Sequence, residues 1–164
     1  MINVIGAGPV GGYFAYLCEQ GVMIFEEHDA IGKPVACTGI MTKRIFDLVK
    51  LDKKVIVNEL DKVRVVGGSK EVEFKLNEKE IVVDRERFDR FLLDKAVDKG
   101  VKLVLGHRFI GCKNNQAVFR VKNALKRYEY DALVGADGPG SLVGREAGLL
   151  GGRKYLVGKQ YRVK

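Results

Sequence analysis

A glycine-rich turn near the start of the chain has the residue types and spacing that bind phosphate groups. Residues 6–11 read Gly-Ala-Gly-Pro-Val-Gly, which fits the pattern GxGxxG. In this pattern Gly6 permits a tight turn, Gly8 lets the backbone approach a pyrophosphate, and Gly11 lets a helix pack closely on a strand. The free N–H groups at the start of the following helix attract the same anion. The turn therefore predicts a dinucleotide-binding site.

An acidic residue farther along the chain narrows the choice of dinucleotide. Glu26 lies 20 positions after Gly6, at the end of a predicted strand over residues 22–25. An acid at this place accepts hydrogen bonds from the ribose hydroxyls and repels a 2′-phosphate. On its own, Glu26 would be interpreted more simply as a solvated acid at a strand end. The spacing favours NAD or FAD over NADP.

The elements around these residues form a βαβ unit. Residues 2–5 are a short apolar strand, residues 10–20 have helical periodicity, and Gly21 is placed to end that helix. The glycine pattern thus follows a strand and opens a helix, which is the context it requires. The apolar residues at helical spacing are Val10, Phe14, Leu17 and Cys18.

The next part of the chain predicts a loop, a short helix and a hairpin. Gly32, Pro34 and Gly39 break regular structure over residues 29–39, and Thr42 is placed to cap a helix through Lys50. Alternating strands are expected at 62–66 and 71–76 around a turn at 67–69, with a further strand at 80–83.

A second helix and an antiparallel meander follow. Asp84 is placed to cap a helix that runs to about Lys99, and Gly100 to end it. Its expected buried face comprises Phe88, Phe91, Leu92 and Val97. The remaining expected elements are strands at 101–105, 108–113, 117–122, 126–130 and 132–135, a helix at 141–147 and a strand at 154–164.

This order of elements predicts an α/β fold of a particular kind. A nicotinamide-binding Rossmann half continues with helices that alternate with parallel strands. Here hairpins and a meander intervene before the buried strand at 132–135. We therefore expect a glutathione-reductase-like, FAD-binding Rossmann domain with an inserted antiparallel β-meander.

Four stretches, in order, resemble the geranylgeranyl reductase family, which is related to p-hydroxybenzoate hydroxylase. They are residues 4–12, 26–40, 83–92 and 131–141. The first is shared by many flavoproteins and the last by the hydroxylase-related group. The second stretch is the most specific, because it contains an Ile-Gly-Lys-Pro-Val run and then a cysteine.

The resemblance implies roles for matched residues. Arg85 would reach the FAD phosphates or the flavin side, although a surface arginine explains it equally well without the family. Asp137 and Gly138 would lie beneath the pyrophosphate and ribityl chain, and Asp137 is also placed to cap the next helix. Cys37 would pass near the flavin ring, or be a spectator thiol, because its Cys-Thr-Gly-Ile context departs from many relatives. The expected cofactor-binding set is Gly6, Gly8, Pro9, Val10, Gly11, Glu26, Glu27, Cys37, Arg85, Phe109, Ala136, Asp137 and Gly138.

The implied activity is an FAD-dependent reduction of isoprenoid double bonds in prenyl lipids. The electron donor, ferredoxin or NAD(P)H, stays open, and no catalytic residue is assigned. Two alternatives remain: part of an FAD-dependent aromatic monooxygenase, or a non-catalytic FAD-binding half that needs a partner chain.

Length suggests that the resemblance covers only an N-terminal portion, because family members are much longer than 164 residues. We expect residues 1–153 to be the FAD/NAD(P)-binding domain and residues 154–164 to begin a strand of a substrate domain whose remainder is absent. The chain alone would then be inactive, and a complementing C-terminal chain or a homo-oligomer is the expected partner.

Composition limits the other possibilities. The net charge of +8 comes from basic residues scattered among acidic ones, so no nucleic-acid binding is expected. Three cysteines without a CxxC pair and two histidines predict no metal site. There is no apolar run long enough for a membrane span and no signal-peptide pattern. The expected location is the cytoplasm, with peripheral attachment to a membrane left open.

Overall fold

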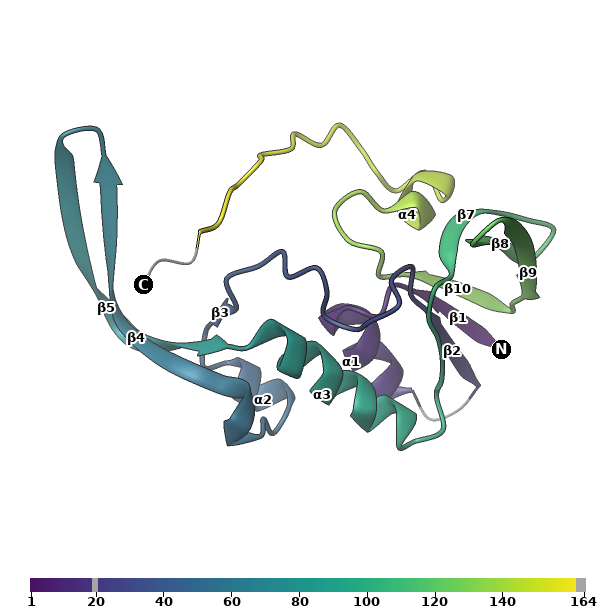
Figure 1. Ribbon diagram of the computed structural model, residues 1–164, viewed down its shortest axis with the longest axis horizontal. Helices are drawn as coiled ribbons and strands as arrows, with labels where there is room; N and C mark the ends of the chain where they lie inside the picture. The colour runs from purple at the N-terminus through teal and green to yellow at the C-terminus, as the bar shows by residue number, and fades with distance from the viewer. Residues whose placement is uncertain (19–20, 162–164) are drawn as a thin grey trace.

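The fold is built around a parallel sheet covered on both faces. The computed structural model describes residues 1–18 and 21–161. The sheet has the order β10-β1-β2-β6, with all neighbouring strands parallel. Helices α1 and α3 cover one face, and an antiparallel sheet of β7, β8 and β9 packs on the other (Figure 1). The strands are β1 (Ile2–Ile5), β2 (Val22–Phe25), β6 (Lys102–Val104) and β10 (Ala132–Gly135).

Helix α1 (Pro9–Leu17) meets the core through only part of the apolar set that the sequence predicts, because Phe14 and Cys18 pack against the core while Val10 and Leu17 do not. Its buried residues are Gly11, Gly12 and Ala15, whereas Val10 and Leu17 are 70% and 58% exposed. Small residues face inward where α1 packs against α3: a Cβ on Gly12 would already be in van der Waals contact with the backbone N of Leu93, at 3.4 Å. Large apolar side chains would not fit between the two helices. The helix also ends before the predicted residue 20, although Gly21 has the expected positive φ of 70°; residues 19–20 lie outside the described residues.

Helix α3 (Arg85–Val97) begins where the sequence predicts. The carboxylate of Asp84 accepts a hydrogen bond from the backbone N–H of Arg87, and Gly100 follows the helix with φ +92°. Phe88 and Leu92 are buried as expected, but Val97 is 42% exposed. Leu93 and Ala96 complete the buried face instead, because they meet α1 and the sheet.

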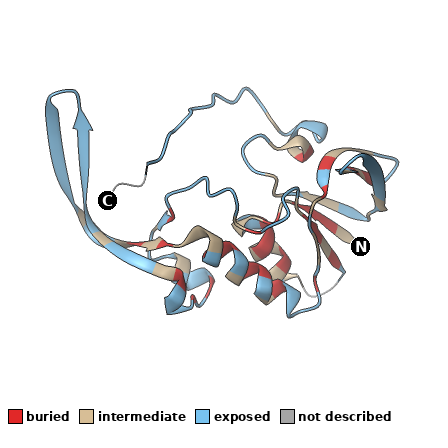
Figure 2. Ribbon diagram, in the orientation of Figure 1, coloured by how far each residue is buried: buried red, intermediate tan, exposed pale blue. Residues whose placement is uncertain are grey.

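The second sheet is a long hairpin that projects from the body (Figures 1 and 2). Strand β4 (Ile56–Gly67) pairs antiparallel with β5 (Lys70–Val83), and β3 (Ile40–Met41) adds to the base of β5. The hairpin was predicted, but the two strands expected at 71–76 and 80–83 are one continuous strand. Helix α2 (Ile45–Leu48) is shorter than predicted, and a single 3₁₀ turn (Lys53–Val55) follows it.

The predicted meander is confirmed. Its strands are β7 (Arg108–Lys113), β8 (Gln116–Val121) and β9 (Ala124–Glu129), and Asn114 and Asn115 form the first turn with positive φ. Aromatic packing joins this sheet to the parallel sheet, because the rings of Phe25 and Phe119 stack with centroids 4.3 Å apart. Helix α4 (Leu142–Glu146) then follows β10.

The strand expected at 154–164 is not formed in the described residues. Residues 154–161 have no regular structure and are exposed, with Leu156 and Val157 at 99% and 94%. A strand requires a neighbouring strand for its backbone hydrogen bonds, and the described part of the chain places none beside this segment. The division into two domains stays a prediction. Among the described residues, the structure contains no helix that is long and apolar enough to span a membrane.

Candidate functional site

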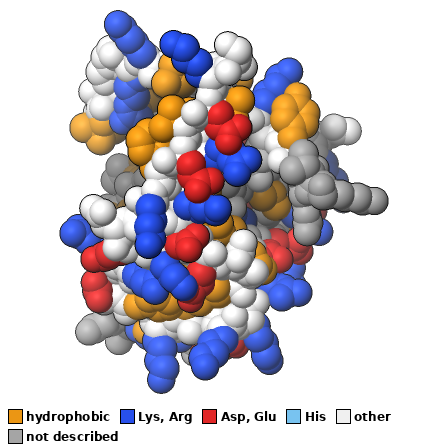
Figure 3. Space-filling model, turned by 90° about the vertical axis from the view of Figure 1, so that its left-hand side faces the viewer, with side chains coloured by type: hydrophobic (Ala, Val, Ile, Leu, Met, Phe, Trp, Pro, Cys, Tyr) orange, Lys and Arg blue, Asp and Glu red, His pale blue; other side chains and the backbone are white. Residues whose placement is uncertain are grey.

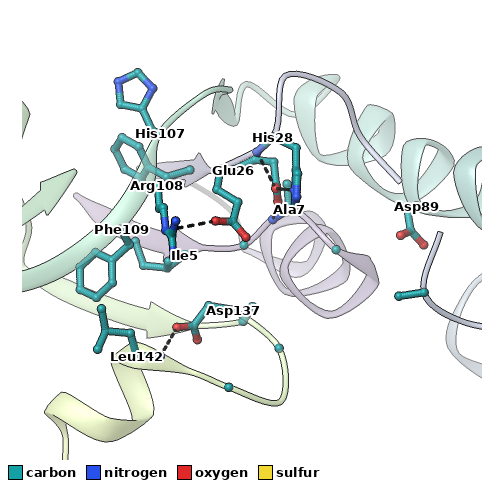
Figure 4. Close-up of a pocket in the computed structure, with 18 of the residues that line it drawn as sticks. Ile5, Ala7, Glu26, His28, Asp89, His107, Arg108, Phe109, Asp137 and Leu142 are labelled. Atoms are coloured by element: carbon teal, nitrogen blue, oxygen red, sulfur yellow. Dashed lines mark hydrogen bonds and ion pairs between the residues drawn. The ribbon is translucent and has the colours of Figure 1, made fainter. Parts of the chain in front are cut away.

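A cleft of about 700 Å³ opens at the carboxyl ends of the parallel strands. Its walls come from the turn between β1 and α1, the end of β2, the loop at 30–36, the start of β7 and the turn between β10 and α4 (Figure 4). Open parallel sheets bind ligands at this edge, and small-molecule sites have volumes of this order. The elements predicted to carry the site therefore do meet in one place.

The three glycines of the predicted turn are required for different reasons. Gly6 has φ +99°, and a Cβ there would stand 2.4 Å from the carbonyl oxygen of Ala136. A Cβ on Gly11 would stand 2.0 Å from the carbonyl oxygen of Gly6. At Gly8, by contrast, a Cβ would meet no atom of the chain within 4 Å. Packing explains the first two glycines, whereas at Gly8 the chain leaves open space at the start of α1.

Glu26 lies at the end of β2, where it holds the glycine turn. Its Oε2 accepts a hydrogen bond from the backbone N–H of Ala7 at 2.9 Å. Its Oε1 accepts from the backbone N–H of His28 at 3.0 Å and lies 2.6 Å from the Nδ1 of the same residue (Figure 4). The side chain is 13% exposed and faces the cleft. The sequence located this residue, and its contact with a ribose stays a prediction.

The wall beside Glu26 contains groups that the sequence did not single out. Arg108 forms an ion pair with Glu27 at 3.6 Å. His107 is 7% exposed; its Nδ1 lies 2.7 Å from the carbonyl oxygen of Leu105, and its Nε2 lies 3.1 Å from the hydroxyl of Tyr128. Both side chains line the cleft next to the buried Phe109. No local motif marks His107, because its partners come from tertiary packing.

Asp137, on the opposite wall, caps helix α4. Its Oδ2 accepts hydrogen bonds from the backbone N–H groups of Leu142 and Val143 at 2.7 and 3.1 Å, and its Oδ1 accepts one from the hydroxyl of Ser141. The capping alternative is therefore what the structure shows. Asp137 still lines the cleft together with Gly138, where a Cβ would again meet no atom of the chain within 4 Å.

Arg85 forms an ion pair with the carboxylate of Asp89. Its Nε and Nη2 each donate to Asp89 at 3.0 Å, and the two side chains are 17% and 7% exposed. Burial raises the pKa of the Asp89 carboxyl, and the guanidinium opposes that rise. Asp89 lines the cleft and Arg85 does not. Contact between Arg85 and a cofactor stays a prediction.

Cys37 is exposed beside Arg85, at the edge of the site. Its Sγ accepts a hydrogen bond from the backbone N–H of Gly39 at 3.4 Å. That hydrogen bond, and to a smaller extent Arg85, lowers the pKa of the Cys37 thiol. The neighbouring loop is fixed in place, because a Cβ on Gly39 would stand 2.2 Å from the carbonyl oxygen of Val83.

The cleft brings together most of the predicted residues. Eight of the set line it: Gly6, Gly8, Glu26, Glu27, Phe109, Ala136, Asp137 and Gly138. Five do not: Pro9, Val10, Gly11, Cys37 and Arg85. Val10 points away into an apolar groove against α2 and α3. Within residues 1–18 and 21–161, no cluster of His, Cys, Asp or Glu is arranged to hold a metal ion.

Sequence comparison finds relatives among archaeal lipid reductases. Digeranylgeranylglycerophospholipid reductase 1 of Methanococcoides burtonii is 29% identical over 89% of the chain, and the reductase of the same name from Methanothrix thermoacetophila is 32% identical over 90%. The chain spans about two fifths of these relatives, 39% and 41% of their lengths. It covers 87% of a third relative, an uncharacterized protein in the nifH2 5′ region of Methanosarcina barkeri, at 27% identity. No protein-family model matches the chain.

Comparison with solved structures gives the same grouping. A geranylgeranyl bacteriochlorophyll reductase-like protein from Thermoplasma acidophilum matches 90% of this chain and 41% of its own, with a TM-score of 0.76 and 27% identity. A flavoprotein/dehydrogenase from Cytophaga hutchinsonii matches with a TM-score of 0.64 at 21% identity, over 93% of this chain and 43% of its own, and shares the fold. By sequence and by fold, this chain is similar to the N-terminal part of the geranylgeranyl reductase-like flavoproteins.

Proposed function

We propose that the cleft binds the ADP half of FAD and that the chain forms the FAD-binding portion of a reductase acting on isoprenoid double bonds of prenyl lipids. The observation that carries this proposal is the open space at Gly8. Gly6 and Gly11 are explained by packing within the chain, but Gly8 is free of such contacts and lies at the start of α1. A group that approaches the backbone closely at this point accounts for a glycine there.

The surroundings of Gly8 fit a pyrophosphate. The N–H groups in the first turn of a helix lack partners within the helix, and Gly8, as N-cap, supplies no side-chain cap. Pro9 has no N–H, so Val10 and Gly11 supply the donors of this first turn. Together with the positive end of the helix dipole, they favour an anion. On either side, Glu26 would accept from a ribose and Gly138 would let the cofactor approach.

The names of the longer relatives give a reductase activity, and we propose that this chain forms one part of such an enzyme. Bound FAD supplies the hydride chemistry, and the protein binds, orients and shields the cofactor. The relatives' names indicate a digeranylgeranyl phospholipid as substrate, and ferredoxin and NAD(P)H both remain as electron donors. A complementing chain would supply the rest of the substrate site.

A flavin-binding measurement tests the cofactor part. Purified protein should show flavin absorption bands after incubation with FAD and removal of free cofactor. Gly8→Val should abolish these bands while the protein stays folded, because the open space at Gly8 would be filled without a clash inside the chain. Gly151→Val is the matched control, since its Cβ also meets no atom within 4 Å but lies outside the cleft. Absence of bound flavin in the wild-type protein would refute the proposal.

A turnover measurement tests the reductase part separately. The FAD-loaded protein is reduced chemically with dithionite and given a geranylgeranyl phospholipid. When a complementing C-terminal chain is supplied as well, mass spectrometry should detect the gain of a pair of hydrogen atoms for each reduced double bond. Product formed without that chain would place the activity in this chain alone, and stable flavin binding without product even in its presence would favour the non-catalytic alternative.

A further inference from the structure

Two acids and one arginine lie together at the end of the cleft formed by β2 and β7. Glu26 and Glu27 follow β2 directly, and Arg108 is the first residue of β7. All three line the cleft, and the Nε of Arg108 lies 3.6 Å from the Oε2 of Glu27. Glu26 and Arg108 are on the same side of the cleft (Figure 4). In dinucleotide sites an acid at this place selects a free ribose 2′-hydroxyl, whereas a nearby arginine accommodates a 2′-phosphate. This wall therefore contains the groups for both specificities.

Backbone hydrogen bonds fix Arg108 next to Glu26. The carbonyl oxygen of Glu26 accepts a hydrogen bond from the N–H of His107 at 2.8 Å, and the carbonyl oxygen of His28 accepts one from the N–H of Gly106 at 3.2 Å. Arg108 thus directly follows the residue that pairs with Glu26. Because the two segments are already joined through their backbones, the ion pair beside them is not needed to hold them together.

The Glu27–Arg108 ion pair also adds little to the stability of the fold. The side chains of Arg108 and Glu27 are 69% and 51% exposed, and exposed ion pairs contribute little because both partners remain solvated. Similar pairs occur on the projecting β4–β5 hairpin, where Arg64 lies 3.0 Å from Glu71. Figure 3, which faces that side of the molecule, shows acidic and basic side chains next to one another on this surface. The Glu27–Arg108 pair differs from these pairs because it lines a cleft.

Glu27 opposes the binding of a 2′-phosphate in two ways. It occupies the guanidinium of Arg108, which is the group that would otherwise form charge-assisted hydrogen bonds with a phosphate. It also adds a second negative charge beside Glu26, so that two acids and one arginine leave this wall with a net charge of −1. Without the charge of Glu27 the wall would be neutral, and Arg108 would be free to bind an anion.

We propose that Glu27 is a specificity-determining residue of the cleft: by holding Arg108 it excludes dinucleotides that carry a 2′-phosphate. The inference rests on the proposed function, because it requires the adenosine end of the cofactor to lie at this wall. FAD and NADP share the adenosine and the pyrophosphate, so a site for this half distinguishes the two at the 2′ position. Glu27 would then keep NADP(H) out of the FAD site.

The test compares ADP-ribose with 2′-phospho-ADP-ribose, two probes that differ only in the 2′-phosphate. Isothermal titration of the cofactor-free protein measures both dissociation constants, and their ratio is the preference for a free 2′-hydroxyl. The wild-type protein should prefer ADP-ribose. Glu27→Gln should reduce that preference roughly tenfold, because it removes one charge at close range and releases Arg108. Adding Arg108→Met to Glu27→Gln should restore the preference, since the gain requires the free guanidinium.

Asp29→Asn is the matched control. It removes one negative charge two residues from Glu27, but Asp29 is exposed and does not line the cleft, so the preference should stay at the wild-type value. Circular dichroism of all variants should match the wild-type spectrum, because the three substituted side chains are exposed.

Three outcomes would overturn the inference. They are an unchanged preference in Glu27→Gln, an equal change in Asp29→Asn, and a gain for the 2′-phosphate that persists after Arg108→Met. A separate titration of the wild-type protein with FAD distinguishes the two proposals. FAD binding together with any of these outcomes overturns the role of Glu27 alone, whereas a protein that binds neither FAD nor ADP-ribose refutes the proposed function as well.

Discussion

At the scale of single residues, replacing a glycine of the turn by alanine should affect stability at Gly11 but FAD binding at Gly8. Gly11→Ala places a methyl group 2.0 Å from the carbonyl oxygen of Gly6, so the turn or the helix must move. We expect a loss of about 1–3 kcal/mol in the free energy of unfolding, which is typical of overpacking. Gly8→Ala should leave that free energy nearly unchanged and should weaken FAD binding. Denaturant unfolding of the apoprotein measures both, and an equal loss of stability in the two variants would contradict this account.

Cys37 should ionise at a lower pH than an ordinary cysteine. The Gly39 N–H and then Arg85 stabilise its thiolate, so its pKa is lowered and the thiolate forms at a lower pH than in a free cysteine. The rate of alkylation by iodoacetamide, followed by peptide mass spectrometry, should rise with pH around a midpoint below that of free cysteine. Arg85→Met should move the midpoint upward only in part, because the Gly39 hydrogen bond remains. A midpoint at or above that of free cysteine would refute the assignment.

At the scale of elements, substitutions at the start of helix α4 test whether Asp137 only caps the helix or also binds the cofactor. Ser141 caps the helix through the backbone N–H of Gly144, while Asp137 binds the N–H groups of Leu142 and Val143. Ser141→Ala and Asp137→Ala should each cost about 1 kcal/mol of stability, as for other lost helix caps. If Asp137 also binds the cofactor, Asp137→Ala should reduce FAD affinity more than Ser141→Ala does. Equal affinities in the two variants would leave Asp137 with the capping role alone.

At the scale of the whole molecule, the segment after α4 should be the first part to be cleaved. Residues 151–161 are exposed and are joined to no strand of the described residues, so a protease can bind their backbone. Limited trypsin digestion should cut after Arg153, Lys154 and Lys159 before it cuts within the parallel sheet. The shortened protein should still bind FAD, because the cleft uses no residue beyond Arg145. Loss of flavin binding on this cleavage would show that the segment belongs to the site.

The sequence by itself determined the features that depend on local geometry. The glycine spacing, the position of Glu26 and the cap at Asp84 follow from which residues tolerate a tight turn or accept backbone hydrogen bonds, and such rules act within a few residues. The same is true of the meander, where Asn114 and Asn115 provide the positive φ of the turn. Together with the resemblance, these features were enough to predict the fold class and eight of the residues that line the cleft.

Only the tertiary structure decided which groups face one another. The buried face of α1 consists of its small residues because α3 approaches closely, although helical periodicity favoured Val10 and Leu17. Asp89 forms an ion pair with Arg85, and hydrogen-bond contacts with Leu105 and Tyr128 hold His107 at the cleft. These contacts depend on how distant segments pack, and a helix with apolar residues on two sides can present either side to the core. The sequence likewise predicted a hairpin in this region, while its projection from the body became visible only in the folded chain.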